Sequence, residues 1–238
     1  MVTPILPLTM TGAVVKRRGK TLLGPVDLDI TAQGFTIVMG PNGAGKTKLL
    51  RALHGIERLA AGTVTWQVPV REAQERQAFV FQAPIMLRRS VQDNLAYPLR
   101  LRGVAKKDAN ARAAHWADRV GLGDALGRSA PRLSGGEKQK LALARALIRD
   151  PDIIFLDEPC ANLDGRATRE IEAILKEAQA GGTRIVMATH DIGQAKRLAD
   201  TVVFLMHGKI IENRPAKAFF AGPQTPQAAA LLQGDIVE

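Results

Sequence analysis

The chain has 238 residues, of which 46% are apolar, enough for the core of one large domain or two small ones. No run of 18 or more apolar residues occurs, and the N-terminus has no basic segment, so we expect neither a membrane-spanning helix nor a signal peptide. The net charge of +10 indicates an anionic partner, such as nucleic acid or a membrane surface.

The N-terminal third is predicted to contain strands, a glycine-rich loop and a helix. Residues 8–30 are expected to be extended, because polar and apolar residues alternate there. The apolar run 35–39 predicts a buried strand, and a helix is expected from about residue 46. The loop between them has the pattern G-x-x-x-x-G-K-[ST] and consists of Gly40, Pro41, Asn42, Gly43, Ala44, Gly45, Lys46 and Thr47.

This loop has the chemistry of a phosphate site. Its glycines allow backbone conformations that a side chain would forbid, so that successive N–H groups approach phosphate oxygens closely. The helix directs its N-terminus at the same phosphates. Lys46 supplies a positive charge, and the Thr47 hydroxyl is a hard ligand suited to magnesium. The loop predicts a nucleoside triphosphate with Mg²⁺ as the ligand.

Two short strands, at 62–66 and 78–81, are followed by a segment with helical periodicity at 90–130. Residues 84–112 hold seven Lys or Arg residues against two Asp, which is half of the net charge. This segment is interpreted either as a solvated basic face or as a surface against anionic lipid headgroups. Nucleic-acid binding is less favoured, because Tyr97 is the only stacking aromatic in it.

A second anion site is predicted at Ser134, Gly135 and Gly136. Ser134 has the position of an N-cap, with an apolar helix face behind it. The two glycines beside the cap expose backbone N–H groups at the positive end of the helix dipole. Since one core already has a phosphate loop, the second loop is expected to serve a different nucleotide.

Two adjacent carboxylates, Asp157 and Glu158, end an apolar strand predicted at 152–157. Side chains at the C-terminal ends of buried strands build the sites of α/β folds. Asp157 can hold magnesium, directly or through water, and Glu158 can take a proton from an attacking water.

Strands and helices alternate from residue 135 onward, which predicts a mostly parallel sheet. The fold class is therefore α/β, a P-loop core with a helical insertion. We expect a single domain, in which residues 1–83 and 141–214 form the core and residues 84–140 the helical subdomain. A short helix pair is expected at 215–238.

The order of these motifs resembles the ATP-binding cassette (ABC) ATPases along nearly the whole chain. Residues 40–47 resemble the Walker A loop, residues 153–158 the Walker B strand and residues 133–139 the signature motif. Gln82 lies where the family has its Q-loop glutamine, residues 160–164 resemble the D-loop, and His190 resembles the switch histidine. In addition to the α/β core, the family resemblance implies an N-terminal antiparallel β subdomain.

The resemblance implies roles for these residues. Glu158, His190 and Gln82 are expected to be catalytic, and Thr47, Gln82 and Asp157 to hold Mg²⁺. Residues 134–136 of one chain are expected to cap the ATP that the loop of a second chain binds, and Asp164 to touch the opposite site. The other histidines, His54, His115 and His207, are interpreted as structural.

Two positions depart from the family pattern. The family stacks adenine on an aromatic residue about 25 positions before Walker A, but no aromatic occurs there, and Arg18 has the expected place. A guanidinium can stack on a base plane, so Arg18 is the candidate. Lys48 stands where the family often has a small hydroxyl residue.

The resemblance implies an ATPase that powers an ABC transporter, as a homodimer on the cytoplasmic face of the membrane. The single cysteine, Cys160, fits a reducing cytoplasm. Residues 82–101 are expected to contact separate permease subunits, and a solute-binding protein to act indirectly. Residues 86–99 resemble the tungstate importer ATPases, which are near the phosphate and molybdate types. The alternatives are import of another solute, such as an amino acid, a soluble cassette acting on nucleic acid or ribosomes, and a P-loop kinase.

Overall fold

The computed structural model describes residues 3–161 and 163–235. A three-stranded antiparallel sheet has the order β2-β1-β4, formed by β1 (Leu8–Arg17), β2 (Lys20–Ile30) and β4 (Ala61–Thr65). A six-stranded sheet has the order β5-β6-β7-β3-β8-β9. Its strands are β3 (Phe35–Met39), β5 (Gln77–Val80), β6 (Ile153–Asp157), β7 (Arg184–Ala188), β8 (Thr201–Met206) and β9 (Lys209–Pro215). All of its neighbours are parallel except β8 and β9, so this is the predicted α/β architecture.

The central strands are mostly apolar because both faces of the large sheet are covered. On β6, Ile154 and Leu156 belong to the core beneath α5 (Gly135–Leu147) and α6 (Gly165–Ala180). Phe155 belongs to the opposite core, which α1 (Lys46–His54) shares with β1 and β2. Alternating side chains point to opposite faces of a strand, so a strand covered on both faces is apolar at most positions.

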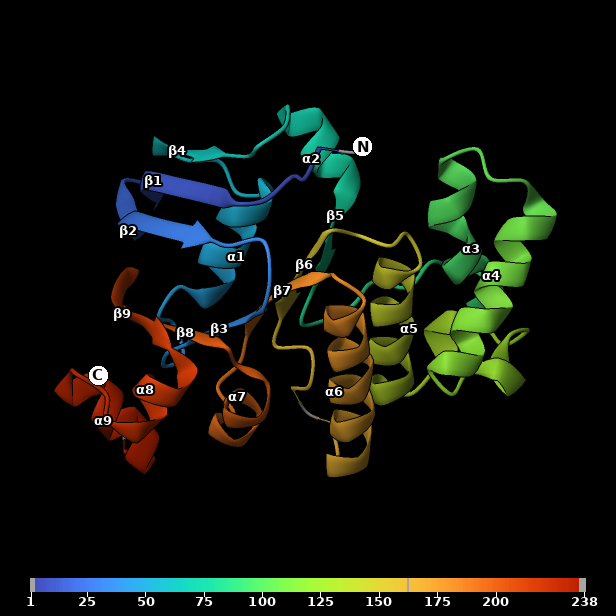
Figure 1. Ribbon diagram of the computed structural model, residues 1–238. Coiled ribbons are helices and arrows are strands. Elements are labelled where there is room, and N and C mark those ends of the chain that lie inside the picture. The colour runs from blue at the N-terminus through green and yellow to red at the C-terminus, as the bar shows by residue number, and fades with distance from the viewer. Residues whose placement is uncertain (1–2, 162, 236–238) are drawn as a thin grey trace.

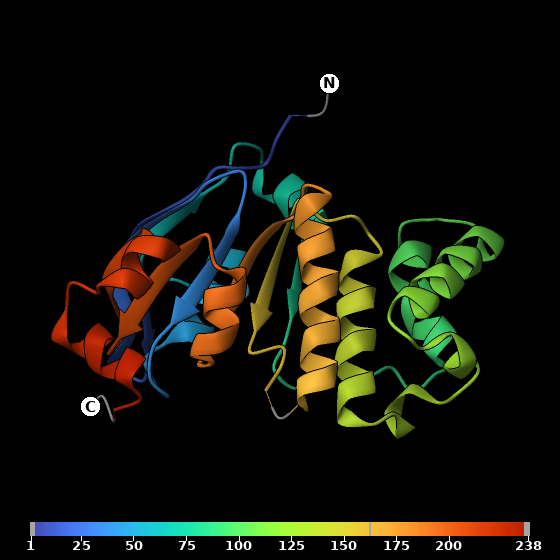
Figure 2. The ribbon, with the colours of Figure 1, turned by 60° about the horizontal axis from the view of Figure 1, so that its bottom comes forward.

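The helical insertion lies to one side of the sheet (Figures 1 and 2). Helices α3 (Val91–Leu101) and α4 (Lys106–Arg119) pack on each other, and α5 lies between them and α6. Two 3₁₀ turns, Gly123–Ala125 and Ala130–Arg132, lead from α4 to α5. Helix α5 is continuous through residue 140, where we placed the end of the helical subdomain, and that division stays a prediction.

Two elements were not predicted from the sequence, the short helix α2 (Val70–Arg76) and the edge strand β9. The C-terminal helix pair was predicted, and consists of α8 (Ala216–Ala221) and α9 (Pro226–Gln233) at the opposite end of the sheet from α3 and α4 (Figure 1). Residues 236–238 of this tail and residue 162 of the expected D-loop lie outside the described residues. Among the described residues, no helix has the length and apolar character needed to cross a membrane.

Parallel strands place the candidate residues at one edge of the sheet. Residue 40 follows β3, residue 82 follows β5, residues 157–158 end β6 and residue 190 follows β7. These four strands are neighbours, so their carboxyl ends meet along that edge, where α/β proteins bind ligands.

Candidate functional site

The glycine-rich loop surrounds the N-terminus of α1 and leaves several backbone N–H groups there without a hydrogen-bond acceptor among the described residues. At Gly40, φ is 152° and a Cβ atom would lie 2.1 Å from the carbonyl oxygen of Leu205, so only glycine fits. Gly45, at the N-cap of α1, is left-handed and offers no side-chain cap. Within the described residues, the backbone N–H groups of Gly43, Gly45 and Lys46 take no partner. The loop therefore presents unpaired donors at the positive end of a helix, as an anion site requires.

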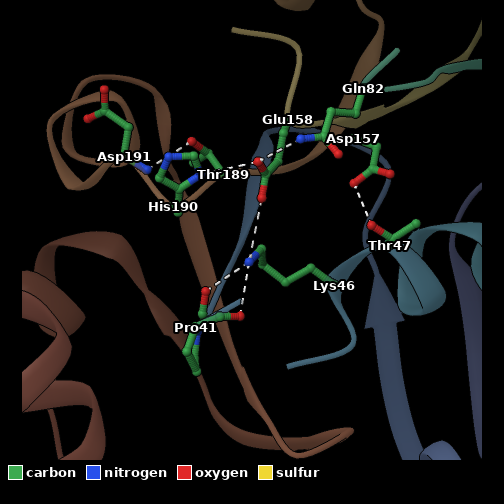
Figure 3. Close-up of polar contacts among 10 residues, drawn as sticks. Pro41, Lys46, Thr47, Gln82, Asp157, Glu158, Thr189, His190 and Asp191 are labelled. Carbon is green, nitrogen blue, oxygen red and sulfur yellow. Dashed lines mark hydrogen bonds and ion pairs between the residues drawn. The ribbon is translucent and has the colours of Figure 1, made fainter. Parts of the chain in front are cut away.

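Lys46 is held in place by the loop that precedes it. Its ammonium group donates to the carbonyl oxygens of Gly40 at 2.9 Å and Pro41 at 3.2 Å, and lies 3.6 Å from Glu158 Oε1 (Figure 3). The Lys46 side chain is only 6% exposed, so its charge acts in a poorly solvated place. An anion that enters the loop meets a fixed positive charge.

Thr47 and Asp157 bring two oxygen ligands together. The Thr47 hydroxyl donates to Asp157 Oδ1 at 2.9 Å, and burial raises the pKa of the Asp157 carboxyl (Figure 3). A hydroxyl, a carboxylate and the nearby amide of Gln82 form a hard donor set that fits Mg²⁺. Among the described residues, no group of three or more His, Cys, Asp or Glu side chains gathers around a metal position. A cation here would be coordinated both by these protein oxygens and by phosphate oxygens, as Mg²⁺ commonly is.

Glu158 is the centre of the polar contacts. Its φ of 47° is left-handed, which is unusual for a residue with a long side chain, and its N–H donates to the carbonyl of Ala188 at 3.0 Å. Its carboxylate is contacted by Lys46, by Gln82 Nε2 at 3.4 Å and by His190 Nδ1 at 3.2 Å (Figure 3). A carboxylate in this position can accept a proton from a water molecule beside the loop.

His190 lies between β7 and α7 (Ile192–Leu198), which turns its ring toward Glu158 (Figure 3). The turn is fixed by Asp191, whose N–H donates to Thr189 Oγ1 and whose carboxylate caps α7 by accepting from Gln194 N at 2.8 Å. The His190 side chain is 61% exposed, so it remains accessible from solution.

The cleft over the loop has a volume of about 390 Å³. Leu22 of β2 lines it together with the loop, Gln82 and Glu158; the apolar alternation of β2 gave no signal for this role. Arg18 is not among the lining residues, because it lies in the exposed turn between β1 and β2. A part for Arg18 in holding a base stays a prediction. Lys48 Nζ forms an ion pair with Glu57 Oε2 at 2.9 Å, and the Thr47 hydroxyl donates to Asp157.

The second predicted anion site lies at the N-terminus of α5. Ser134 and Glu137 form a complete capping box, in which each side chain accepts from the other residue's backbone N–H. The N–H groups of Gly135 and Gly136 take no partner within the described part of the chain. Asp164 caps α6 by accepting from Ala167 N at 2.8 Å, and lines a hollow of about 400 Å³ with residues 134–136.

Among the residues that the structure describes, the two clefts have no lining residue in common. The first site combines a lysine, a hydroxyl and two carboxylates with its backbone donors. The second hollow places the N–H groups of Gly135 and Gly136 near the side chains of Lys140 and Arg166. The structure brings the first set of predicted residues together, and leaves residues 134–136 and Asp164 apart from them.

A glycine-rich loop with a buried lysine, next to carboxylates at the ends of parallel strands, defines the class of P-loop nucleoside triphosphatases. The sequence profile of the family described as ABC transporter matches residues 23–161. The chain belongs to the ABC transporter family, and it is an ATPase of that family. The predicted family, fold class and activity are thereby confirmed.

Several curated import proteins are similar to the chain over most of its length. The phosphate import ATP-binding protein PstB 2 of Natronomonas pharaonis is 36% identical, with 92% of this chain and 84% of that protein covered. The tungstate uptake system ATP-binding protein TupC of Peptoclostridium acidaminophilum is 37% identical, with 85% and 94% covered. The nickel import ATP-binding protein NikO of Rhodobacter capsulatus is also 37% identical, with 94% and 95% covered.

Solved structures have the same fold. CbiO1 from Clostridium perfringens, described as part of the ABC transporter complex cbiONQ, has a TM-score of 0.81 at 25% identity, with 95% of each chain covered. A dimeric ATP-binding cassette bound to ADP and Pi has a TM-score of 0.79 at 24% identity, with 88% of this chain and 98% of that one covered.

Proposed function

We propose that this chain is the ATP-hydrolysing subunit of an ABC importer. The observation that carries the proposal is the presence of two incomplete anion sites on one chain, which share no lining residue. Import ATP-binding proteins for anions and for other solutes are among its relatives.

The two sites become one when two chains associate head to tail. In this arrangement ATP on residues 40–47 of one chain is capped by Ser134, Gly135 and Gly136 of the other, and Asp164 lies near the opposite site. A two-fold axis produces two such sites from one pair of surfaces. ATP then acts as a joint between the chains, and hydrolysis removes the joint.

Each residue of the first site has a proposed part in hydrolysis. Thr47, Asp157 and Gln82 hold Mg²⁺, which neutralises charge on the phosphates when it is bound. Glu158 takes the proton of the attacking water, and His190 holds the γ-phosphate and that water in line. Lys46 and the loop N–H groups stabilise the charge that develops on the phosphoryl group.

The permease contact is proposed at a groove of about 630 Å³ beside the first site, lined in part by residues of the 82–101 segment. Three large apolar side chains of this segment are exposed there, Ile85 at 77%, Leu101 at 69% and Tyr97 at 37%. Exposed apolar patches of this kind mark interaction sites. Met86 and Leu87 of the same segment add adaptable apolar surface.

The exposed basic residues of the insertion are proposed to face anionic lipid at the cytoplasmic surface of the membrane. Arg100, Arg102, Lys106, Lys107 and Arg112 are all exposed, on α3, α4 and the turn between them. Each basic residue near an anionic surface contributes about 1 kcal/mol of attraction. This surface and the groove share Arg102, so permease and lipid can be contacted together.

We propose an oxyanion, such as tungstate, as the cargo. Support comes from the likeness of residues 86–99 to tungstate importer ATPases and from the relatives named for tungstate, phosphate and anion import. Sequence identity alone does not select the cargo, because the nickel protein is as similar as the tungstate protein. The ATPase does not touch the cargo, so kinship is the only route by which its sequence carries this information.

Uptake of labelled tungstate, molybdate and phosphate by a strain lacking this chain tests the proposal. We expect tungstate uptake to be lost and to return with the wild-type chain, but not with Lys46→Ala. If only phosphate uptake is lost, the cargo is phosphate and not tungstate, and the assignment of the chain as an importer ATPase stands. Unchanged uptake of all solutes, together with co-purification of ribosomes, would replace the importer by a soluble cassette.

A further inference from the structure

A buried carboxylate joins the two helices that follow the catalytic loops. Glu172 of α6 is 5% exposed, and both of its oxygens are occupied by α7. Arg197 donates to them through Nε at 2.9 Å and Nη2 at 2.6 Å, and Gln194 Nε2 donates at 3.3 Å. Two parallel N–H···O bonds from one guanidinium fix both distance and orientation.

Helix α7 depends on such contacts for its place. It has seven residues, fewer than an isolated helix needs for stability in water. Its first residue is two positions after His190, and its N-cap is Asp191. The position of α7 therefore sets the position of the turn that carries His190.

The same carboxylate connects three functional segments. Helix α6 begins at its cap Asp164, beside residues 134–136. Gln194, which contacts Glu172, also lies next to the thiol of Cys160, two residues after Glu158. Glu172 thus lies where the D-loop helix, the segment after Glu158 and the helix after His190 meet.

We propose that Glu172 is a positioning residue for hydrolysis, which acts through α7 to keep His190 Nδ1 at Glu158. It touches neither nucleotide nor attacking water. Its effect follows from geometry, since the ring that contacts Glu158 at 3.2 Å is carried by a turn whose next helix is tied to α6. This proposal rests on the part given to His190 in hydrolysis, and not on the cargo or the permease.

A buried ion pair can also serve stability alone, because removing one partner leaves an uncompensated charge. The two interpretations differ in one respect. A positioning residue loses its effect on turnover when the residue that it positions is removed, whereas a stabilising residue does not. A double-mutant cycle with His190 separates them.

The experiment uses the full chain, with ATP hydrolysis followed by phosphate release. Glu172→Gln keeps the shape of the side chain and removes its charge. We expect kcat to fall about tenfold, because a displacement of about 1 Å in a catalytic group has effects of this order or larger. The affinity for Mg-ATP should change less than twofold. The matched control is Glu177→Gln, on the same helix, which removes an exposed pair with Arg119 and should leave kcat unchanged.

In the His190→Ala background, Glu172→Gln should cause no further loss of the remaining turnover. Equal losses in both backgrounds, or an unchanged kcat in the single variant, would overturn the proposal. If Glu172→Gln does not fold, Arg197→Lys takes its place in the cycle, since it keeps a cation opposite Glu172 and removes the planar fork. If His190→Ala alone leaves kcat unchanged, the assignment of His190 fails, and the proposal fails with it.

Discussion

The N-termini of α1 and α5 both present backbone N–H groups that take no partner among the described residues, but they are built differently. Helix α1 has no side-chain cap, and the N–H groups of Gly43, Gly45 and Lys46 take no partner within the described residues. Helix α5 begins with a complete capping box from its own sequence. The N–H groups at the start of α1 remain for the nucleotide. The start of α5 is already capped by its own side chains, so only the N–H groups of Gly135 and Gly136 remain for a ligand.

The surroundings differ in the same sense. Lys46, at the start of α1, and Asp157, at the end of β6, are buried, so their charge is poorly screened. Ser134 and Gly135 are exposed. The comparison supports the proposed dimer, in which the first region binds the nucleotide and carries the chemistry, and the second region contributes a preformed surface to the partner chain.

The most severe break of the first region is Glu158→Gln. It removes the proposed base and keeps the size of the side chain, so we expect steady hydrolysis to fall about 10²–10⁴-fold. ATP binding should remain, and Mg-ATP should trap a dimer. Phosphate release and light scattering measure the two effects. Rapid turnover by this variant would rule out Glu158 as the base.

Lys46→Ala removes the fixed charge of the loop. Charge-assisted hydrogen bonds contribute about 1.5–3 kcal/mol each, so the affinity for Mg-ATP should fall about ten- to a hundredfold. Titration with a fluorescent ATP analogue measures this loss. Lys176→Ala, on α6 and outside both clefts, is the control. Unchanged affinity in Lys46→Ala would refute the interpretation of the loop.

Gly136→Ala tests the second region by itself. A Cβ atom there would lie 3.7 Å from Ala167 Cβ and 3.8 Å from Leu163 Cδ2, which are ordinary contacts. Replacing glycine by alanine within a helix favours the helix by roughly 0.5–1 kcal/mol. We therefore expect the chain to melt at the same temperature or higher.

The same methyl group would lie on the surface that caps the partner's ATP. Turnover at saturating ATP should fall about tenfold, the cost of roughly 1.4 kcal/mol in the closed dimer, while binding of ATP to the separate chain is retained. Wild-type turnover in Gly136→Ala would contradict the shared site. A loss of ATP binding by the separate chain would show that the two regions are not independent.

The last prediction concerns the stability of the fold in acid. Burial between Phe79 and Phe155 lowers the pKa of His54, at the C-terminus of α1, from 6.5 to about 4. The unfolded chain therefore takes up this proton first as the pH falls. Stability is fully present above about pH 6.5 and declines by up to ~1.4 kcal/mol for each pH unit down to about 4.

Urea unfolding between pH 7 and pH 4 measures this slope. In His54→Leu the slope should be reduced by this amount, because the group that titrates is gone. An unchanged slope would show that other groups control the acid response. The second region has no part in this effect, since the His54 ring packs on β5 and β6.

Much of the first region could be predicted from sequence, because its residues are fixed by local patterns at strand ends. The second loop could also be predicted, since Ser134 and two glycines precede an apolar helix face. Strand β9 was missed because Glu212 occupies an inward position, where its Oε1 accepts from Thr225, and so breaks the apolar alternation. Helix α2 is short and has one buried residue, Ala73, so its periodicity is weak.

Contacts between distant segments left no local signal. Leu22 reaches the nucleotide cleft only because β2 lies over the loop, and Glu172 meets Arg197 only because α6 and α7 are neighbours in space. The place of Arg18 was expected from spacing along the chain, but an exposed turn has no fixed direction toward the cleft.

The left-handed backbone of Glu158 has a consequence for selection in the laboratory. A residue with a long side chain is held there at a cost of roughly 1–2 kcal/mol, which glycine avoids and asparagine reduces. Libraries of this ATPase that are screened for heat resistance alone should therefore accumulate Gly or Asn at this position. Such variants would pass the screen without hydrolysing ATP, so directed evolution of thermal stability in this chain must also select for turnover at every round.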